Sequence, residues 1–348
     1  MLAFMFENGG KLVLKEVPEP KAKPGSGVIK VEATSICGTD IRAFRFGSKQ
    51  IIPPRIIGHE GVGTFVELGS EIKNFKTGDR VQVAPALGCG TCGCCRKGHT
   101  NLCEKLTTIG FEYDGTFAEY MEVPAEAFAQ NHVSKVPDNL SFLEATLAEP
   151  IACIINAQSY LNIAKGDAVA VFGSGFIGIM HAALAYQKGA EKVFMIDVNE
   201  ERLKTAQKFL PALITINSAK ETIKDKVFQN TNNLGVDVAV VACSVGPAQV
   251  DAMNIIARLG RISLFGGLVT ESTGFIDSNI IHYREASVHG AKASSAVQNR
   301  EALDLLSSGK LSVKEFTNNS FPLKDILKAF EELSKENIVK AILQPGLK

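Results

Sequence analysis

The fold of this chain is decided by the stretch VAVFGSGFIG, residues 169–178. A buried apolar strand over 168–172 leads into the glycines of a GxGxxG turn, and a helical pattern follows over 176–188. Such a strand, turn and helix are typical of dinucleotide binding. Three roles are expected: Gly173 permits the tight turn, Gly175 lets the backbone approach a pyrophosphate, and Gly178 allows close packing of strand and helix. The helix N-terminus, at Phe176 and Ile177, would offer its N–H groups to the anion.

An acidic residue lies where the next strand ends. Asp197 follows Gly178 by nineteen residues and can accept hydrogen bonds from both hydroxyls of an adenine ribose. A carboxylate at this point repels a 2′-phosphate, which predicts NAD rather than NADP as the cofactor. Arg202, five residues later, could accommodate that phosphate and keeps NADP open. The alternative is a packing turn beside a surface aspartate.

The pattern around this stretch predicts two kinds of domain. Apolar strands alternate with helices from 153 to 290, which indicates a doubly wound parallel sheet. The strands are expected at 168–172, 193–196, 236–241 and 261–265, and the helices at 176–188, 200–209 and 249–257. Earlier residues form short β-type runs broken by Gly and Pro, as in an antiparallel barrel or sandwich, at 27–33, 61–68, 79–84 and 117–123. After them come helical stretches at 300–307 and 324–336 and a strand near 339–343.

Length and charge exclude several classes of protein. At about 150 residues per domain, 348 residues suggest about two domains. The 37 basic and 37 acidic residues cancel, which argues against a general nucleic-acid binder. Residues 168–187 are long enough to span a membrane, but they contain a glycine-rich turn and lack basic flanks, so we expect no membrane segment. The first ten residues lack a basic signal-peptide region, which favours a cytoplasmic protein with reduced thiols.

The eight cysteines are unevenly spread, with five between Cys89 and Cys103. Four thiolates satisfy the tetrahedral demand of a structural zinc. The spacing favours a lobe over about 86–104 whose ligands are Cys89, Cys92, Cys95 and Cys103, which leaves Cys94 out. The rival interpretations are a nucleic-acid-binding zinc ribbon, which would want a basic surround, and an iron–sulfur cluster.

A second set of possible metal ligands is mixed. Cys37, His59, Glu60 and Glu149 offer a thiolate, an imidazole and two carboxylates. Such a set, with one position left open, is what a Lewis-acid zinc requires. Each of these residues alone could equally be structural.

Taken together, the motifs resemble the zinc-dependent medium-chain alcohol dehydrogenase family, and within it the polyol (sorbitol-like) dehydrogenase branch. The match spans nearly the whole chain, and its motifs are Cys37-Gly38-Thr39-Asp40, Gly58-His59-Glu60-Gly61, the cysteine lobe, Gly115-Thr116-Phe117-Ala118-Glu119-Tyr120, Ala148-Glu149-Pro150 and the nucleotide turn. The resemblance implies a GroES-like β-barrel catalytic domain, 1–152 plus 291–348, with a Rossmann domain, 153–290, inserted. It also implies a homodimer or homotetramer.

The resemblance further implies the roles of the second metal set. Cys37 and His59 would be ligands of a catalytic zinc, and either Glu60 or Glu149 would complete its shell. Asp40 would orient His59. Zinc would lower the pKa of a substrate hydroxyl, Thr39 would take its proton, and hydride would pass to C4 of NAD.

Two departures from the family bear on the substrate. Arg42 stands where the family often has a relay histidine, and Ala293 stands where sorbitol dehydrogenases carry a polyol-binding arginine. We therefore expect reversible oxidation of a secondary hydroxyl of a polyol, cyclitol or sugar alcohol, with sorbitol itself disfavoured by Ala293. The alternatives are a sugar-phosphate polyol dehydrogenase, an L-threonine 3-dehydrogenase, and a non-catalytic nucleotide-binding or redox-sensing protein.

Overall fold

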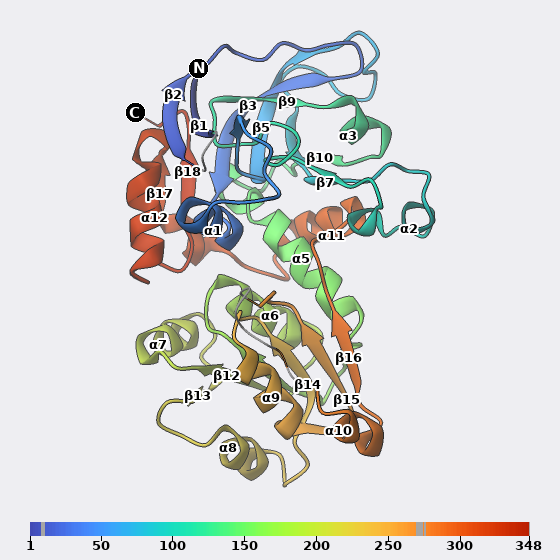
Figure 1. The fold of residues 1–348 in the computed structure, drawn as a ribbon, viewed down its shortest axis with the longest axis vertical. Helices are drawn as coiled ribbons and strands as arrows, with labels where there is room; N and C mark the ends of the chain where they lie inside the picture. The colour runs from blue at the N-terminus through green and yellow to red at the C-terminus, as the bar shows by residue number, and fades with distance from the viewer. Residues whose placement is uncertain (8–10, 269–273, 275, 348) are drawn as a thin grey trace. The chain divides into compact units, whose positions relative to one another are not determined.

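The computed structural model describes residues 1–7, 11–268, 274 and 276–347. Its contacts divide the chain into two compact units (Figure 1). One comprises Met1–Ala152 with Ala293–Lys348, and the other comprises Cys153–Lys292. Each unit is described by itself.

The first unit is built on a mixed sheet with the strand order β10-β6-β5-β3-β18-β17, in which β9 also pairs with β3. Its strands are β3 (Gly27–Ser35), β5 (Glu60–Leu68), β6 (Arg80–Val83), β9 (Tyr120–Val123), β10 (Val133–Lys135), β17 (Ser320–Pro322) and β18 (Ile342–Gln344). The late strand β18 pairs with β3, so the C-terminal segment completes a sheet begun near the N-terminus. Two small sheets accompany it, from β1 (Leu2–Phe6), β2 (Leu12–Glu16) and β4 (Arg55–Ile56), and from β7 (Ala86–Leu87) and β8 (Thr107–Thr108).

Short helices connect these strands. They are α1 (Gly38–Phe46), α2 (Gly93–Arg96), α3 (Ala125–Ala129), α4 (Phe142–Ala145), α11 (Ala296–Ser307) and α12 (Ile326–Ser334), with 3-10 turns η1 (Thr100–Leu102), η2 (Lys314–Asn318) and η3 (Leu323–Asp325). Helix α5 (Ala148–Ser159) begins in this unit and ends in the next. One apolar cluster joins α12 to the first strand through Phe4 and Phe330, whose rings meet edge to face at 5.8 Å. Helix α1 is thereby anchored, because Phe44 contacts the same Phe330 ring.

The second unit is a six-stranded parallel sheet with the order β13-β12-β11-β14-β15-β16. The strands are β11 (Ala168–Phe172), β12 (Lys192–Asp197), β13 (Ile214–Asn217), β14 (Val236–Val241), β15 (Ile256–Leu264) and β16 (Ser287–Gly290). The helices are α6 (Phe176–Gln187), α7 (Glu200–Phe209), α8 (Ile223–Asn230), α9 (Gly246–Ile255) and α10 (Ser278–Arg284) (Figure 1). Helix α6 contacts β11 and β12, and α9 contacts β11, β14 and β15. The predicted doubly wound sheet is confirmed. Its strand order reverses between β11 and β14, and ligands of such sheets bind outside the strand ends at that point.

Several predicted elements differ at their ends; for example, the strand expected at 261–265 is β15, which begins at Ile256, and the helix expected at 300–307 is α11, which begins at Ala296. The strand expected at 117–123 begins only at Tyr120, because Phe117 and Ala118 pair instead with the first strand. The helix expected to reach 257 ends at Ile255, where β15 begins directly. The last strand covers Ile342–Gln344 rather than 339–343.

Candidate active site and metal sites

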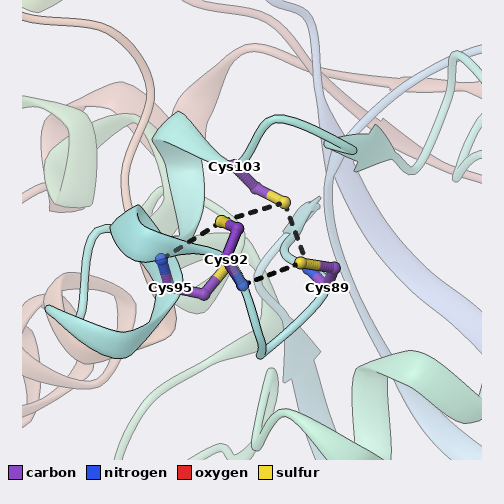
Figure 2. Close-up of side chains that lie close together, drawn as sticks. All are labelled: Cys89, Cys92, Cys95 and Cys103. Carbon is purple, nitrogen blue, oxygen red and sulfur yellow. Dashed lines mark hydrogen bonds between the residues drawn. The ribbon is translucent and has the colours of Figure 1, made fainter.

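The four predicted lobe cysteines lie together. Their sulfur atoms are all within 4.8 Å of one another, and Figure 2 shows the side chains gathered around a common centre. Cys89 follows β7, Cys92 is the N-cap of α2, Cys95 lies within α2, and Cys103 ends η1. Short turns rather than long elements therefore position all four. Cys94 lies outside the group.

The geometry and charge of this group fit a zinc ion. The sulfurs of Cys92 and Cys103 are 3.9 Å apart, close to the ~3.8 Å edge of a tetrahedron built on ~2.3 Å zinc–sulfur bonds. Backbone N–H groups donate to the sulfurs: Cys89 and Lys105 to Cys103 at 3.2 Å, and Cys92 to Cys89 at 3.4 Å. Hydrogen bonds, of which the one with Thr91 contributes most, lower the pKa of Cys89 to about 5. Burial is the largest cause that raises the pKa of Cys95, to about 12, and the hydrogen bond with Cys92 is the next. The raised pKa of Cys95 shows that four neighbouring thiolates would not coexist there without a cation between them.

Replacing Cys103 by serine tests this lobe. We expect Cys103→Ser to lose one zinc per chain and more than about 3 kcal/mol of unfolding free energy, because a structural metal stabilises only the folded chain. Metal content and denaturant unfolding measure both quantities. Cys94→Ser is the matched control, and it should keep the metal and the stability. If Cys103→Ser and Cys94→Ser had the same zinc content and the same unfolding free energy, the lobe cysteines would not form a metal site.

The glycine-rich turn has little spare space at one glycine and open space at another. Gly173 has φ +100°, a conformation that favours glycine. A Cβ on Gly178 would lie 1.8 Å from the carbonyl oxygen of Gly173, so helix α6 can approach the turn this closely only with glycine there. Gly175, the N-cap of α6, has nothing within 4 Å of an added Cβ. That open face is where a phosphate group could approach the N–H groups of Phe176 and Ile177.

Asp197 is tied to this turn. Its Oδ2 accepts hydrogen bonds from the backbone N–H and the hydroxyl of Ser174, at 2.8 and 2.7 Å, and its Oδ1 accepts one from the N–H of Asn199 at 3.0 Å. The carboxylate at the last residue of β12 therefore lies beside the end of β11. Arg202 lies in the first turn of α7, where its N–H donates to the side chain of Asn199. Ser174 is fully buried, and its contact with Asp197 was not foreseen from the sequence.

Two glycine variants should separate packing from binding. Gly178→Ala forces the turn to move, so we expect a clear loss of thermal stability and at least a tenfold loss of dinucleotide affinity, about 1.4 kcal/mol. Gly175→Ala has room for its methyl group and should keep the stability, but it places that group on the face offered to a phosphate. Calorimetric unfolding and titration with the dinucleotide distinguish the two effects. A Gly175→Ala chain that binds as the parent does would contradict the proposed approach.

The second metal set gathers at adjacent strand ends. The ligand atoms of Cys37, His59 and Glu60 lie within 4.8 Å of one another. Strands β3 and β5 are antiparallel and pair Ser35 with Glu60, so the residues after β3 come next to the start of β5. Cys37 then caps α1. Gly58 precedes His59 with φ +93°, and a Cβ there would meet the Phe117 ring at 2.4 Å.

Asp40 supports this group in two ways. Its Oδ2 accepts a hydrogen bond from the N–H of Cys37 at 2.9 Å, which fixes the start of α1. Its Oδ1 lies 3.6 Å from Nδ1 of His59, an atom that is buried and has no hydrogen-bond partner within the described part of the chain. The influence of Asp40 on His59 is therefore electrostatic. Thr39 is exposed, with its hydroxyl oxygen 3.6 Å from the sulfur of Cys37.

The charges of this group favour a cation. Burial lowers the pKa of His59, but the charges of Asp40 and Cys37 outweigh it and hold that pKa well above its usual range. Burial also raises the pKa of Asp40, to about 6. A thiolate, an imidazole and a carboxylate whose ligand atoms lie within 4.8 Å of one another therefore suit a zinc ion.

Both candidate carboxylates are buried, but their surroundings differ. Glu60 Oε2 accepts a hydrogen bond from Lys340 Nζ at 2.5 Å and a very short one from Ser35. Glu149 lies in the first turn of α5, outside the group formed by Cys37, His59 and Glu60. Its charge still contributes to raising the pKa of His59.

Comparison with protein families agrees with this arrangement. Residues 23–138 match the alcohol dehydrogenase GroES-like domain, and residues 177–308 match the zinc-binding dehydrogenase domain. The chain belongs to the zinc-binding alcohol dehydrogenase family. It is therefore an oxidoreductase, and the predicted combination of a GroES-like and a Rossmann domain is confirmed.

Several proteins resemble this dehydrogenase along nearly their whole length. The L-threonine 3-dehydrogenase of Salmonella gallinarum is 32% identical over 95% of either chain. A putative zinc-binding dehydrogenase of Sinorhizobium meliloti, solved with NADP, is 27% identical with a TM-score of 0.91 over 99% of both chains. The 2R,3R-butanediol dehydrogenase of Bacillus subtilis is also 27% identical, with a TM-score of 0.89 over 99% of both chains.

Two other features of the dehydrogenase bear on the predictions. Lys340, the partner of Glu60, carried no sequence signal, since a lone lysine before a strand is unremarkable. Ala293 has φ +50°, an unusual conformation for a residue other than glycine.

Among the described helices, none is long and apolar enough to cross a membrane.

Proposed function

We propose that this dehydrogenase oxidises a secondary hydroxyl of a polyol, cyclitol or sugar alcohol and transfers the hydride reversibly to NAD. The family uses zinc and a nicotinamide cofactor, so the reaction type rests on membership. The observation that carries the proposal is the group of Cys37, His59 and Glu60, with the hydroxyl of Thr39 beside it. The non-catalytic alternative loses its support, since the chain is an oxidoreductase.

Each residue of this group has a separate role in the proposed reaction. When bound, zinc supplies a Lewis acid that lowers the pKa of a substrate hydroxyl, and the nicotinamide accepts the hydride. Cys37 and His59 would hold the metal, with Glu60 or Glu149 as the third ligand. Thr39, exposed beside Cys37, is placed to accept the hydroxyl proton and pass it outward. Asp40 keeps Cys37 in position through its hydrogen bond to the Cys37 N–H.

Two relatives bear on the substrate class. Butanediol dehydrogenase is named for a diol, which supports a polyol. L-threonine 3-dehydrogenase is named for an amino acid, which keeps that alternative open. Arg42, in place of a relay histidine, argues against threonine.

A panel of alcohols tests the proposal. Reduction of NAD should be followed with polyols, cyclitols, sugar alcohols, butanediol and threonine, before and after prolonged treatment with a strong chelator. We expect turnover with at least one polyol and its loss on chelation. Turnover that is unchanged by chelation, or confined to threonine, would overturn the proposal.

The choice of NAD rests on Asp197. Its carboxylate would lie near a 2′-phosphate, and two like charges about 4 Å apart repel by about 1 kcal/mol even in water. Asp197→Ala is therefore expected to improve kcat/KM with NADP at least fivefold relative to NAD. Steady-state kinetics with both cofactors measure the ratio, and an unchanged ratio would show that Asp197 does not select the cofactor.

A further inference from the structure

The segment between Asp40 and Glu60 carries only positive charges. Residues 41–59 contain no acidic residue, but they contain Arg42, Arg45, Lys49 and Arg55. The chain as a whole is neutral. A local excess of cations in a neutral chain needs a physical reason.

Only one of these four cations is neutralised. Arg55 forms an ion pair with Asp114 at 2.9 Å. Arg42, Arg45 and Lys49 are exposed, and none of them has an ion-pair or hydrogen-bond partner for its side chain among the residues that the structure describes. Their charges are therefore available to a ligand.

Helix α1 aligns the two unpaired arginines with the candidate active site. Its buried residues are Asp40 and Ala43, whereas Thr39, Arg42 and Arg45 are exposed. Residues three apart are neighbours on a helix surface, so these three form one continuous stripe. The stripe starts at the hydroxyl that lies beside Cys37. At 1.5 Å per residue, Arg42 is about 4.5 Å and Arg45 about 9 Å farther along the helix axis.

The orientation and chemistry of the side chains suit an anion. Cα–Cβ bonds tilt toward the N-terminus of a helix, so Arg42 reaches back toward Thr39. The buried charged groups near the metal ligands are three carboxylates, Asp40, Glu60 and Glu149, and one cation, Lys340, so the side chains leave a net negative charge there that would repel an anion. An anionic group of the substrate is therefore better placed one helical turn away. Arginine binds phosphate through two parallel hydrogen bonds, and a second arginine suits its dianion.

We propose that the substrate is a polyol phosphate monoester whose phosphate binds Arg42, with Arg45 behind it, while its hydroxyl lies near Thr39 and Cys37. The inference rests on the proposed function, because it assumes a polyol at that centre. A terminal phosphate, several bonds from the reacting hydroxyl, matches the offset along α1. The carboxylate of threonine is next to the carbon that bears its amino group and does not reach as far.

The test compares each polyol with its own terminal monophosphate, using erythritol, ribitol and sorbitol as parents, on the zinc-loaded enzyme. We expect at least one monophosphate to exceed its parent in kcat/KM by about 30-fold or more, since charge-assisted bidentate bonds are strong. Arg42→Gln should remove most of that preference through KM and leave the parent polyols within about threefold. Inorganic phosphate should compete with the monophosphate, and less so in the variant.

Arg258→Gln is the matched control, since it removes an exposed arginine from the other unit. It should leave the preference intact. Arg42→Lys should restore part of it. The inference is overturned if parent and monophosphate are used equally, if Arg42→Gln changes KM for NAD instead, or if threonine is the better substrate. If the parent polyols are turned over normally without any phosphate preference, this inference alone fails. If no alcohol of the panel is oxidised, the proposed function fails.

Discussion

Cys37→Ser is expected to lower kcat/KM by at least about a thousandfold, or about 4 kcal/mol of transition-state stabilisation. A serine hydroxyl stays protonated near neutral pH and is a poor ligand for zinc, whereas a thiolate is a strong one. Because the nucleotide turn belongs to the other unit, binding of the dinucleotide should persist. Steady-state kinetics with the preferred alcohol measure kcat/KM, and titration with NAD measures the binding of the dinucleotide.

The controls for this variant lie in the same unit. Cys103→Ser should also lose one zinc per chain, but its main effect falls on stability, and Cys94→Ser should change neither. Cys37→Ser should therefore lose turnover with little loss of unfolding free energy. Turnover retained in Cys37→Ser with full zinc content would remove Cys37 from the catalytic site.

The parts of the molecule that the sequence predicts well are those with local signals. The pattern of residues 168–178 predicts a strand, a turn and the start of a helix, and the structure has β11 and α6 there. The four lobe cysteines span only fifteen positions, so their proximity follows from the shortness of the turns between them. The grouping of Cys37 with His59 needed the family resemblance, and the strand order of the sheets was not predicted, since β-pairing over distant segments leaves no local signal.

What the sequence could not show depends on long-range contacts. Lys340 lies 280 residues from Glu60 and reaches it only because β18 pairs with β3. Ser174 is invisible for a different reason, since nothing in a GxGxxG pattern specifies which partner its second residue has. Asp40 was expected to orient His59, and its Oδ1 lies 3.6 Å from Nδ1 of that ring, a proximity of residues nineteen apart that depends on the pairing of β3 with β5.

Lys340→Met is expected to cost about 3–5 kcal/mol of unfolding free energy, because it leaves a buried carboxylate without its cation. Lys340 and Glu60 are 5% and 1% exposed, so water cannot replace the lost partner. Lys340 Nζ also donates to the carbonyl of Ile36 at 2.9 Å, which joins the segment before β18 to the end of β3. Denaturant unfolding of the zinc-loaded chain measures the loss.

A double-mutant cycle with Glu60→Gln separates the charge from the packing. If the cost comes from an uncompensated carboxylate, Lys340→Met combined with Glu60→Gln should be less destabilised than Lys340→Met alone. The same reasoning predicts that Lys340→Met binds zinc more tightly at the Cys37 group in competition with a chelator, since one positive charge has left a site that already gathers anions. If Lys340→Met alone lost less than about 1 kcal/mol of unfolding free energy, the ion pair would not be neutralising a buried charge. Weaker zinc binding in Lys340→Met would mean instead that Lys340 holds Glu60 where the metal needs it.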